Sequence, residues 1–316
     1  MVQHRRMGRQ VQGILLFDKP VGMGSNEALQ AVKRLFRARK AGHTGSLDRL
    51  ASGLLPMCLG EATKISGFLL NADKRYRAVF RLGEKTTTGD AEGEVIACRV
   101  VPRFTERTFI QVLKEFTGAI EQVPPMHSAL KYRGQRLYKL AHQGLEVERQ
   151  PRTVVIYELR LLGWELERLE VEVFCSKGTY IRTLAEDIGE VLGCGAHVEG
   201  LRRTGSGPFD DSQLLTLPQL RALAEQGAEA LDGVLLPMEA AVSDWPDVNL
   251  PEEVAYYVRQ GQAVLVPHAP TQGWVKIYEN HKRFLGVGEV LDDGRIAPRR
   301  LVNRSFEASK NFHYNQ

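Results

Sequence analysis

The chain has 316 residues, of which 43% are hydrophobic and 25% charged, as expected of a globular protein with more than one domain. No run of 18 apolar residues is present, and the basic N-terminus lacks the apolar stretch of a secretory signal, so we expect neither a membrane span nor secretion. The net charge is +4, but residues 205–260 carry ten acids and only two basic residues, which leaves +12 on the rest of the chain.

The first predicted elements are a strand and a helix joined by a turn. Residues 12–17 (QGILLF) form an apolar run typical of a short buried strand, and the proline and glycine of the following DKPVG end it. Ser25 or Asn26 can cap a helix that runs to about Arg37. Its apolar residues repeat at helical spacing and leave cations such as Lys33 on other positions, so one side can be buried while the other is basic.

A loop, a strand and a second helix follow. Residues 41–53 (AGHTGSLDRLASG) match neither the helical nor the strand period, and their composition indicates a shaped loop that carries function. Residues 74–82 (KRYRAVFRL) alternate as a strand does. Residues 105–116 have the spacing of a helix. We expect its inward side chains to be Phe109, Ile110, Leu113 and Phe116.

Residues 124–150 differ from the segments around them. They begin with Pro-Pro, and no acid occurs between Glu121 and Glu146. Their cations are Lys131, Arg133, Arg136 and Lys139, interspersed with two tyrosines. Aromatic residues among cations suit base stacking together with phosphate contacts, although a single basic cluster can also be a solvated surface. We interpret the segment as an inserted, partly mobile arm that binds nucleic acid.

The rest of the chain predicts a second sheet region and a small barrel. Strands near 153–162 and 168–175 precede an amphipathic helix from about Thr179 to Leu192, which Gly193 can end. Later elements are a strand at 196–203, a helix at 217–226 and short strands at 263–266, 274–278, 284–290 and 295–302. We therefore expect an α+β fold, in which a mixed, mostly antiparallel sheet with flanking helices precedes a small β-barrel.

Sequence motifs for most cofactor chemistry are missing. There is no P-loop, no dinucleotide-binding fingerprint, no GxSxG elbow and no HExxH pair. The cysteines form no CxxC pair and have no histidine at ligand spacing: Cys58, Cys98, Cys175 and Cys194. We expect no cofactor and no metal, and we interpret the cysteines as reduced thiols of a cytoplasmic protein.

The loop segment 42–48 (GHTGSLD) is the remaining candidate for chemistry. A loop aspartate such as Asp48 is most often a turn former or a helix cap. A buried carboxylate can instead act as a nucleophile or a base, and it then needs a cation that keeps it ionised and aimed. Arg182, off the apolar stripe near the start of the amphipathic helix, is one candidate among many arginines. The residues alone leave both interpretations open.

Residues 42–64 (GHTGSLDRLASGLLPMCLGEATK) resemble the defining motif of the TruB family of tRNA pseudouridine-55 synthases, which is close to GHTGTLDPLATGLLP. Further matches follow in the family's order over nearly the whole chain. They are LLFDKPVGMGSN (15–26), DKRYRA (73–78), TGDAEGE (88–94), PPMHSALKYRGQRLYKLA (124–141), CSKGTYIRTLAEDIGE (175–190) and GAHVEGLRRTGSGPF (195–209). An ordered set of this kind is far more specific than any one motif, and it favours a catalytic role for Asp48.

The resemblance implies a fold, a domain arrangement and a reaction. A catalytic domain with the pseudouridine synthase fold would span 1–246, with the arm at about 124–150 as its RNA-binding insertion. Residues 247–302 would form a PUA-like RNA-binding domain and 303–316 a disordered tail. The implied reaction detaches uracil from its ribose, rotates it and rejoins it through carbon 5, which requires no cofactor. The implied target is uridine 55 in the T arm of tRNA.

The resemblance also implies roles for individual residues. Asp48 would be the essential carboxylate, and Arg182 would pair with it. Tyr76 would stack on the target uracil and act in a later proton transfer. Tyr180 and Leu201 match positions that line the uracil pocket.

Other matched positions are expected to contact the RNA or to support the loop. His43 would help to hold the extruded nucleotide by stacking within the RNA. Lys19, in FDKP, would orient the catalytic loop, and Asp90, in TGDAEGE, would contact the T loop. The cations of the arm expected to bind RNA are Lys131, Arg133 and Arg136.

The chain departs from the family pattern beside the predicted catalytic aspartate. Arg49 stands where proline is usual, and Ser46 and Ser52 are milder changes. Arg49 can alter the stiffness of the loop or add a phosphate contact. The motif does not determine which atom Asp48 attacks.

Two other functions compete with that of a tRNA-modifying enzyme. One is an RNA-binding module that holds tRNA without catalysis, which the joint presence of Asp48, Tyr76 and Arg182 disfavours. The other is a related synthase for a guided or ribosomal RNA, and the lysine-rich terminal extension of eukaryotic relatives is not seen. We expect a cytoplasmic monomer with tRNA as its partner and no membrane or protein partner.

Overall fold

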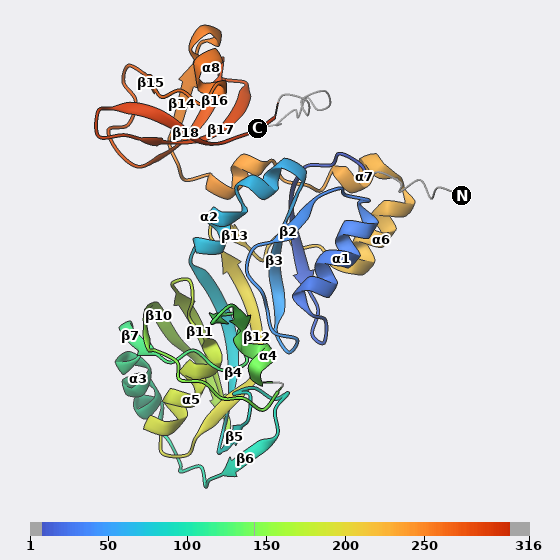
Figure 1. The fold of residues 1–316 in the computed structure, drawn as a ribbon. Helices are drawn as coiled ribbons and strands as arrows, with labels where there is room; N and C mark the ends of the chain where they lie inside the picture. The colour runs from blue at the N-terminus through green and yellow to red at the C-terminus, as the bar shows by residue number, and fades with distance from the viewer. Residues whose placement is uncertain (1–7, 142, 304–316) are drawn as a thin grey trace.

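The computed structural model describes residues 8–141 and 143–303, and it confirms the predicted α+β architecture (Figure 1). The tail expected to be disordered begins at residue 303, and residues 304–316 lie outside the described part of the chain. Within the described ranges, no helix is long and apolar enough to cross a membrane.

A nine-stranded mixed sheet forms the centre of the described N-terminal region. Its main path runs β1-β3-β12-β4-β11-β10-β7, while β2 pairs with β3 and β13 pairs with β12. The strand bounds are β1 Gly13–Lys19, β2 Ala41–His43, β3 Ser52–Leu59, β4 Lys74–Leu82, β7 Gly118–Gln122, β10 Arg152–Glu165, β11 Arg168–Cys175, β12 Ala196–Ser206 and β13 Phe209–Asp210. The pairing of β12 with β3 is parallel and the other described pairs in this sheet are antiparallel.

Two sets of helices cover the two halves of this sheet. Helices α3 and α5 pack against β4, β10, β11 and β12, whereas α1 and α6 pack against β1 and β3 (Figure 1). The helix bounds are α1 Ser25–Leu35, α2 Ser66–Asn71, α3 Glu106–Glu115, α4 Leu137–Ala141, α5 Ile181–Val191, α6 Leu217–Glu225, α7 Ala228–Asp232 and α8 Glu252–Arg259, with the 3-10 helices η1 Gly60–Lys64 and η2 Met238–Val242. Tyr76 and Leu201 pack against both apolar cores, so they mark the junction between the two halves.

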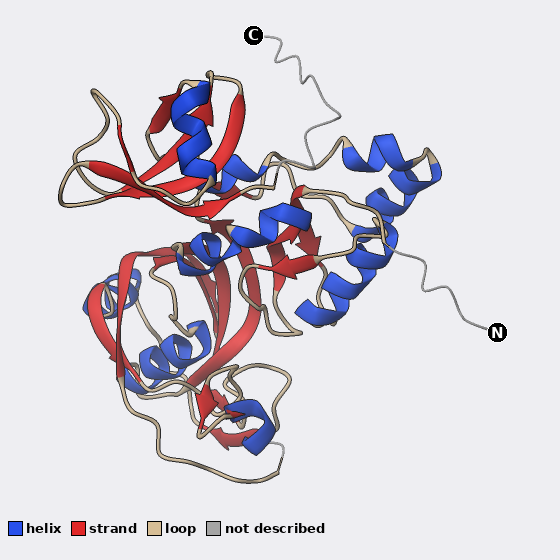
Figure 2. Cartoon of the chain, turned by 45° about the horizontal axis from the view of Figure 1, so that its top comes forward, coloured by secondary structure: helices blue, strands red, loops and turns tan. Residues whose placement is uncertain are grey.

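The C-terminal region forms a separate curled sheet with its own core (Figure 2). Its strand order is β14-β16-β17-β18-β15, and the bounds are β14 Asp247–Leu250, β15 Val264–Leu265, β16 Trp274–Glu279, β17 Arg283–Val290 and β18 Arg295–Leu301. This sheet also packs on the N-terminal region, because the ring of Trp274 lies 4.9 Å from Phe68 and 5.4 Å from Trp245. The predicted small barrel is therefore a curled, open half-barrel docked on α2 and η2.

The arm and its surroundings contain two small hairpins. In the arm, β8 (Lys131–Tyr132) pairs with β9 (Gln135–Arg136), and α4 follows directly. A second hairpin, which was not predicted, joins β5 (Glu84–Thr86) to β6 (Val95–Cys98). Most of the arm side chains that carry charge are exposed, including Lys131, Arg133 and Arg136.

Several details of the sequence prediction are wrong. The residue that caps α1 is Gly24, and Ser25 is instead buried against the loop that carries Asp48. Ile110 of α3 is 52% exposed, because Val112 takes the inward position. The predicted loop 41–53 is shorter than expected, since its ends belong to β2 and β3. Strand β14 and helix α8 were not predicted.

Candidate active site

The loop between β2 and β3 carries Asp48, and neighbouring segments hold it firmly. The Ser25 hydroxyl accepts a hydrogen bond from the Leu47 N–H at 2.7 Å and donates to the Leu47 carbonyl at 2.9 Å. The Thr44 N–H donates to the Pro56 carbonyl at 3.0 Å, and the Ala51 N–H donates to the Asp48 carbonyl at 3.1 Å. These bonds tie the loop to α1 and β3, so the carboxylate projects from a constrained backbone.

Arg182 contacts Asp48 as predicted. Its Nε lies 3.0 Å from Oδ2 of Asp48, and the arginine is only 6% exposed in the first turn of α5. Its other donors bind main-chain carbonyls, with Nη1 3.0 Å from Thr88 O and Nη2 2.8 Å from His127 O. The guanidinium is therefore satisfied on every side, and this arrangement fixes the direction in which Asp48 points.

The charge state of Asp48 is set by opposing influences. Desolvation raises the pKa of its carboxyl above the usual value, and the positive charge of Arg182 opposes that rise. The negative charge of Asp90 adds to the rise, and Lys19 opposes it. Because 44% of the Asp48 side chain is still accessible, the desolvation is partial, and the carboxylate keeps its ion pair with Arg182.

Lys19 and Asp90 lie behind the pair rather than at the surface. Lys19 is fully buried, and its Nζ donates to the carbonyls of Pro20 (2.9 Å), Met23 (2.7 Å) and Arg49 (3.4 Å). Burial lowers the pKa of Lys19 to about 8. Asp90 is 3% exposed, and its Oδ2 lies 3.7 Å from Nη1 of Arg182. Lys19 is thus bonded to the main chain on both sides of the loop entrance, whereas Asp90 faces Arg182.

Tyr76, Leu201 and Tyr180 come from three different elements around Asp48. Tyr76 on β4 is the cross-strand partner of Val173 on β11, and Leu201 on β12 is the partner of Ala78. Tyr180 immediately precedes α5 and is partly buried. Burial raises the pKa of Tyr76 and that of Tyr180, so both side chains are neutral phenols at neutral pH.

Gln122 on β7 is a positioning residue that the sequence did not reveal. Its side chain is 2% exposed; its Oε1 accepts from the Tyr180 N–H at 3.0 Å, and its Nε2 donates to the Tyr180 carbonyl at 3.3 Å. This amide therefore fixes the backbone at the start of α5, two residues before Arg182. The sequence could not reveal this contact, because a glutamine in an alternating strand looks like any exposed polar residue.

His43 is partly buried, whereas the basic side chains of the arm are exposed. Burial lowers the pKa of the His43 imidazole, with the charge of Arg203 adding to the effect, so the ring is neutral at neutral pH. Its Nδ1 is buried without a hydrogen-bond partner among the described residues. Lys131, Arg133 and Arg136 are exposed, and the root of their arm reaches the site through the His127 carbonyl bonded to Arg182.

The departure at Arg49 leaves the loop backbone supported. The Arg49 carbonyl accepts from the Gly22 N–H at 2.8 Å and from Lys19. Its side chain is exposed, with Nη1 3.8 Å from a Glu27 carboxylate oxygen. Arg49 therefore adds an exposed cation beside Asp48 without removing the contacts that shape the loop.

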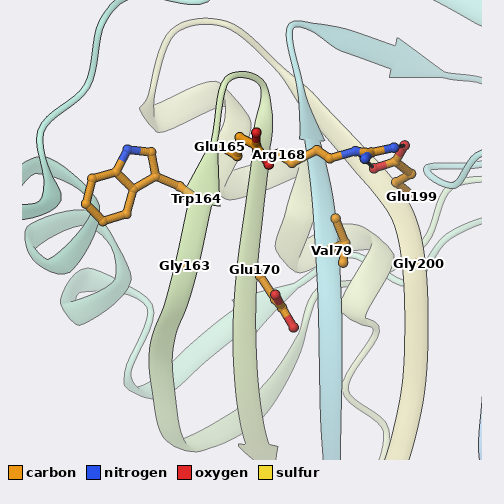
Figure 3. Close-up of a pocket in the computed structure, with 8 residues that line it drawn as sticks. All are labelled: Val79, Gly163, Trp164, Glu165, Arg168, Glu170, Glu199 and Gly200. Carbon is orange, nitrogen blue, oxygen red and sulfur yellow. Dashed lines mark hydrogen bonds and ion pairs between the residues drawn. The ribbon is translucent and has the colours of Figure 1, made fainter.

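A hollow of about 540 Å³ lies on the other face of the sheet and not at this site (Figure 3). Val79 lines it and projects from β4 on the face opposite Tyr76, because side chains alternate along a strand. Its charged wall includes Glu170 and the ion pair between Arg168 and Glu199 at 2.7 Å (Figure 3). The predicted site residues line neither this hollow nor a metal cluster; no group of three potential ligands was found among the described residues.

Family models match the chain over residues 33–243 and 246–302. Residues 33–181 match the model of the TruB family pseudouridylate synthase N-terminal domain. Residues 182–243 match the tRNA pseudouridylate synthase B C-terminal domain, and residues 246–302 match the C-terminal model of pseudouridine synthase II TruB. These three models follow one another without a large gap.

Similar proteins and structures agree with these models. The chain is 58% identical over 300 residues to the tRNA pseudouridine synthase B of Nitrosococcus oceani, covering 95% of this chain and 97% of the relative. It is 52% identical over 315 residues to the protein of that name from Serratia proteamaculans, covering 97% and 100%. A solved Cbf5-Nop10-Gar1 complex contains a chain with a TM-score of 0.73 and 30% identity, covering 92% of this chain and 84% of that one. An H/ACA RNP bound to a substrate RNA containing 2'-deoxyuridine gives a TM-score of 0.71 at 28% identity, covering 93% and 86%.

Proposed function

The chain belongs to the TruB family of pseudouridine synthases, and we propose that it converts uridine 55 in the T loop of tRNA to pseudouridine. It is an isomerase, since the product has the same atoms as the substrate. The identity to relatives named tRNA pseudouridine synthase B supports tRNA as the substrate. The observation that carries the catalytic assignment is the ion pair between Asp48 and buried Arg182, beside the junction of the two apolar cores that Tyr76 and Leu201 contact.

In the proposed reaction, the bond from ribose C1' to uracil N1 breaks and a bond from C1' to C5 forms. The C5 proton leaves and N1 gains a proton, so the reaction is balanced without an oxidant or a second substrate. Asp48 is the carboxylate that reacts with the nucleotide. Arg182 keeps this carboxylate ionised and aimed, because it lies 3.0 Å away while carbonyls hold its other donors.

The other pocket residues act on the base. Tyr76 stacks on the uracil and serves in the removal of the C5 proton, and Tyr180 and Leu201 enclose the ring. Asp90 and Lys19 support this arrangement from behind, Asp90 through Arg182 and Lys19 through the loop carbonyls. For Asp90 this role replaces the predicted contact with the T loop, because the carboxylate is 3% exposed.

Access to uridine 55 requires extrusion of the base from the folded T loop. Extrusion costs a few kcal/mol, which stacking and phosphate contacts can offset. Neutral His43 stacks within the RNA, and the exposed cations of the arm bind phosphates: Lys131, Arg133 and Arg136. The Arg182–His127 hydrogen bond at 2.8 Å links the root of this arm to the catalytic pair.

We also propose a catalytic domain over 1–246, with the arm at 124–150, and a PUA-like RNA-binding domain over 247–302. The start of β14 at Asp247 and the family-model boundary between 243 and 246 support this division. The enzyme acts as a cytoplasmic monomer on the T arm. Sedimentation of the protein with and without tRNA tests whether it is a monomer.

Mapping of pseudouridine in cellular RNA tests the substrate. A strain that lacks the gene is compared with strains that express the chain or its Asp48→Asn variant, and modified positions are located by mass spectrometry. We expect the chain, and not the variant, to restore pseudouridine at tRNA position 55. Restoration in ribosomal RNA alone would establish a synthase for another RNA, and loss of tRNA modification without loss of binding would favour an RNA-holding protein.

A further inference from the structure

Arg203 is a buried cation that the reaction outlined above does not use. It lies on β12 and is 1% exposed. By residue volume, it is the largest fully buried side chain among the described residues. In the described part of the chain, no carboxylate forms an ion pair with it. An isolated charge in a protein interior is costly unless its donors are all satisfied. The retention of a full positive charge at this position therefore calls for a physical reason.

Arg203 is held in place first by its hydrogen bonds to the loop that carries Asp48. The Nε of Arg203 donates to the Leu54 carbonyl at 2.7 Å, and its Nη2 donates to the Gly45 carbonyl at 3.1 Å. Gly45 and Leu54 lie on either side of Asp48 in the sequence. One side chain therefore bridges the two ends of the loop that carries the catalytic carboxylate.

The second neighbour that explains a buried cation at this position is Tyr76. Arg203 and Tyr76 are direct cross-strand partners on β12 and β4, and their side chains share the face that bears Leu201. Burial raises the pKa of Tyr76, and the positive charge of Arg203 opposes this rise. A guanidinium has only donors, so any hydrogen bond between the two side chains would run from Arg203 to the Tyr76 oxygen, with the phenol proton directed elsewhere.

We propose that Arg203 is a positioning residue that orients the Tyr76 hydroxyl and stabilises negative charge on its oxygen, while it clamps the Asp48 loop. The inference rests on the proposed function, in which Tyr76 takes part in proton transfer. A clamp alone would need only neutral donors, because both loop acceptors are main-chain carbonyls. The tyrosine is what calls for a positive charge here, and the same charge adds to the burial that lowers the pKa of His43.

The direct test is a titration of residue 76 without RNA. Tyr76 is replaced by 3,5-difluorotyrosine, whose phenol is more acidic than that of tyrosine, and its ionisation is followed by fluorine NMR. We expect Arg203→Gln to raise the pKa of this phenol by about one unit or more, since loss of an adjacent positive charge has an effect of that size. Arg203→Lys keeps the charge and is expected to shift it much less. Equal values in the parent and in Arg203→Gln would overturn the proposal, as would equal shifts in the two variants.

A second measurement covers the case in which Arg203→Gln fails to fold. The Nη proton signals of Arg203 are compared between the parent and Tyr76→Phe by NMR. Loss of the hydroxyl is expected to shift these signals and to speed their exchange with water. Unchanged signals and exchange would show that the guanidinium does not bind the Tyr76 oxygen.

Single-turnover kinetics then connect the arrangement with the reaction. In a folded Arg203→Gln variant, we expect the rate to fall about tenfold or more with unchanged tRNA affinity. In a Tyr76→Phe background, the same substitution is expected to cost less, because the two residues act as a unit. Arg77→Gln, an exposed arginine on the opposite face of β4, is the matched control and should keep the parental rate. If the effects of the two substitutions on the rate are fully additive, the coupling between Arg203 and Tyr76 is overturned. An inactive parent would instead refute the proposed function, and the titration, which needs no RNA, would still test the inference.

Discussion

The Nε atom of Arg182 lies 3.0 Å from the Asp48 carboxylate while the other nitrogens of the same guanidinium bind the carbonyls of Thr88 and His127. The ion pair is thus one part of a set of bonds that ties three segments together. Loss of the planar guanidinium of Arg182 should therefore disturb the orientation of the Asp48 carboxylate as well as its charge state.

Arg182→Lys tests this relationship. An ammonium group keeps the charge but cannot reach Asp48, Thr88 and His127 in the geometry of a fork, so at least one charged hydrogen bond is lost. We expect the single-turnover rate to fall about 10- to 100-fold while tRNA affinity stays unchanged. A lysine variant with the parental rate would show that charge alone is sufficient.

The pH dependence of the reaction should reveal the influence of Asp90 on Asp48. Desolvation and the Asp90 charge raise the pKa of Asp48, so the ionised form, and the rate, are lost on acidification at a higher pH than for an exposed aspartate. Asp90→Asn removes a negative neighbour and should lower that pKa. We expect the acid limb of kcat/KM, which reports the free enzyme, to move to lower pH. A limb that stays in place or moves up would contradict this electrostatic account, whatever happens to the maximal rate.

Charge reversal in the arm tests its contact with RNA. Arg133→Glu with Arg136→Glu should weaken tRNA binding most at low salt and reduce the slope of log affinity against log salt by about 1.5 to 2, because two phosphate contacts are lost. Arg107→Glu, an exposed arginine on α3, is the control and should change the slope little. Identical slopes in the arm variant and the parent would remove the arm from the interface.

Gly53 provides a test of packing beneath the catalytic loop. Its φ is +95°, and an added Cβ would lie 2.3 Å from the Arg203 carbonyl oxygen. Gly53→Ala should therefore lower the free energy of unfolding by about 2 kcal/mol or more. Gly67→Ala on α2 meets no atom within 4 Å and should be neutral or stabilising by up to about 1 kcal/mol. Chemical denaturation of both variants checks the difference, and equal stabilities would contradict the geometry.

Much of the fold could be predicted because local pattern and tertiary burial agree. Strand β4 has the predicted bounds of 74–82, since its alternating residues face the core and the open side in turn. The cap of α6 at Thr216 was also correct. Helix α8 escaped prediction because only Ala255 and Val258 are buried, and two exposed tyrosines obscure its apolar face.

The candidate site was predictable only where a motif marks it. Asp48 and Arg182 stand in motifs, yet nothing in the local pattern selects this arginine from the others, because the fold alone brings α5 beside the loop. Arg203 gave a weaker signal. Period-two alternation puts it on the same face as Leu201, which could have marked it as buried, but an arginine beside another arginine resembles a solvated basic surface.

The most direct test of the central claim is pseudouridine formation in an unmodified tRNA transcript by the purified chain, with a chelator and no added cofactor. Asp48→Asn is measured beside it, together with the tRNA affinity of both proteins. We expect product at uridine 55 with the parent and none with the variant, at similar affinities. Turnover by Asp48→Asn near the parental rate, or a parent that binds tRNA and forms no product, would contradict it.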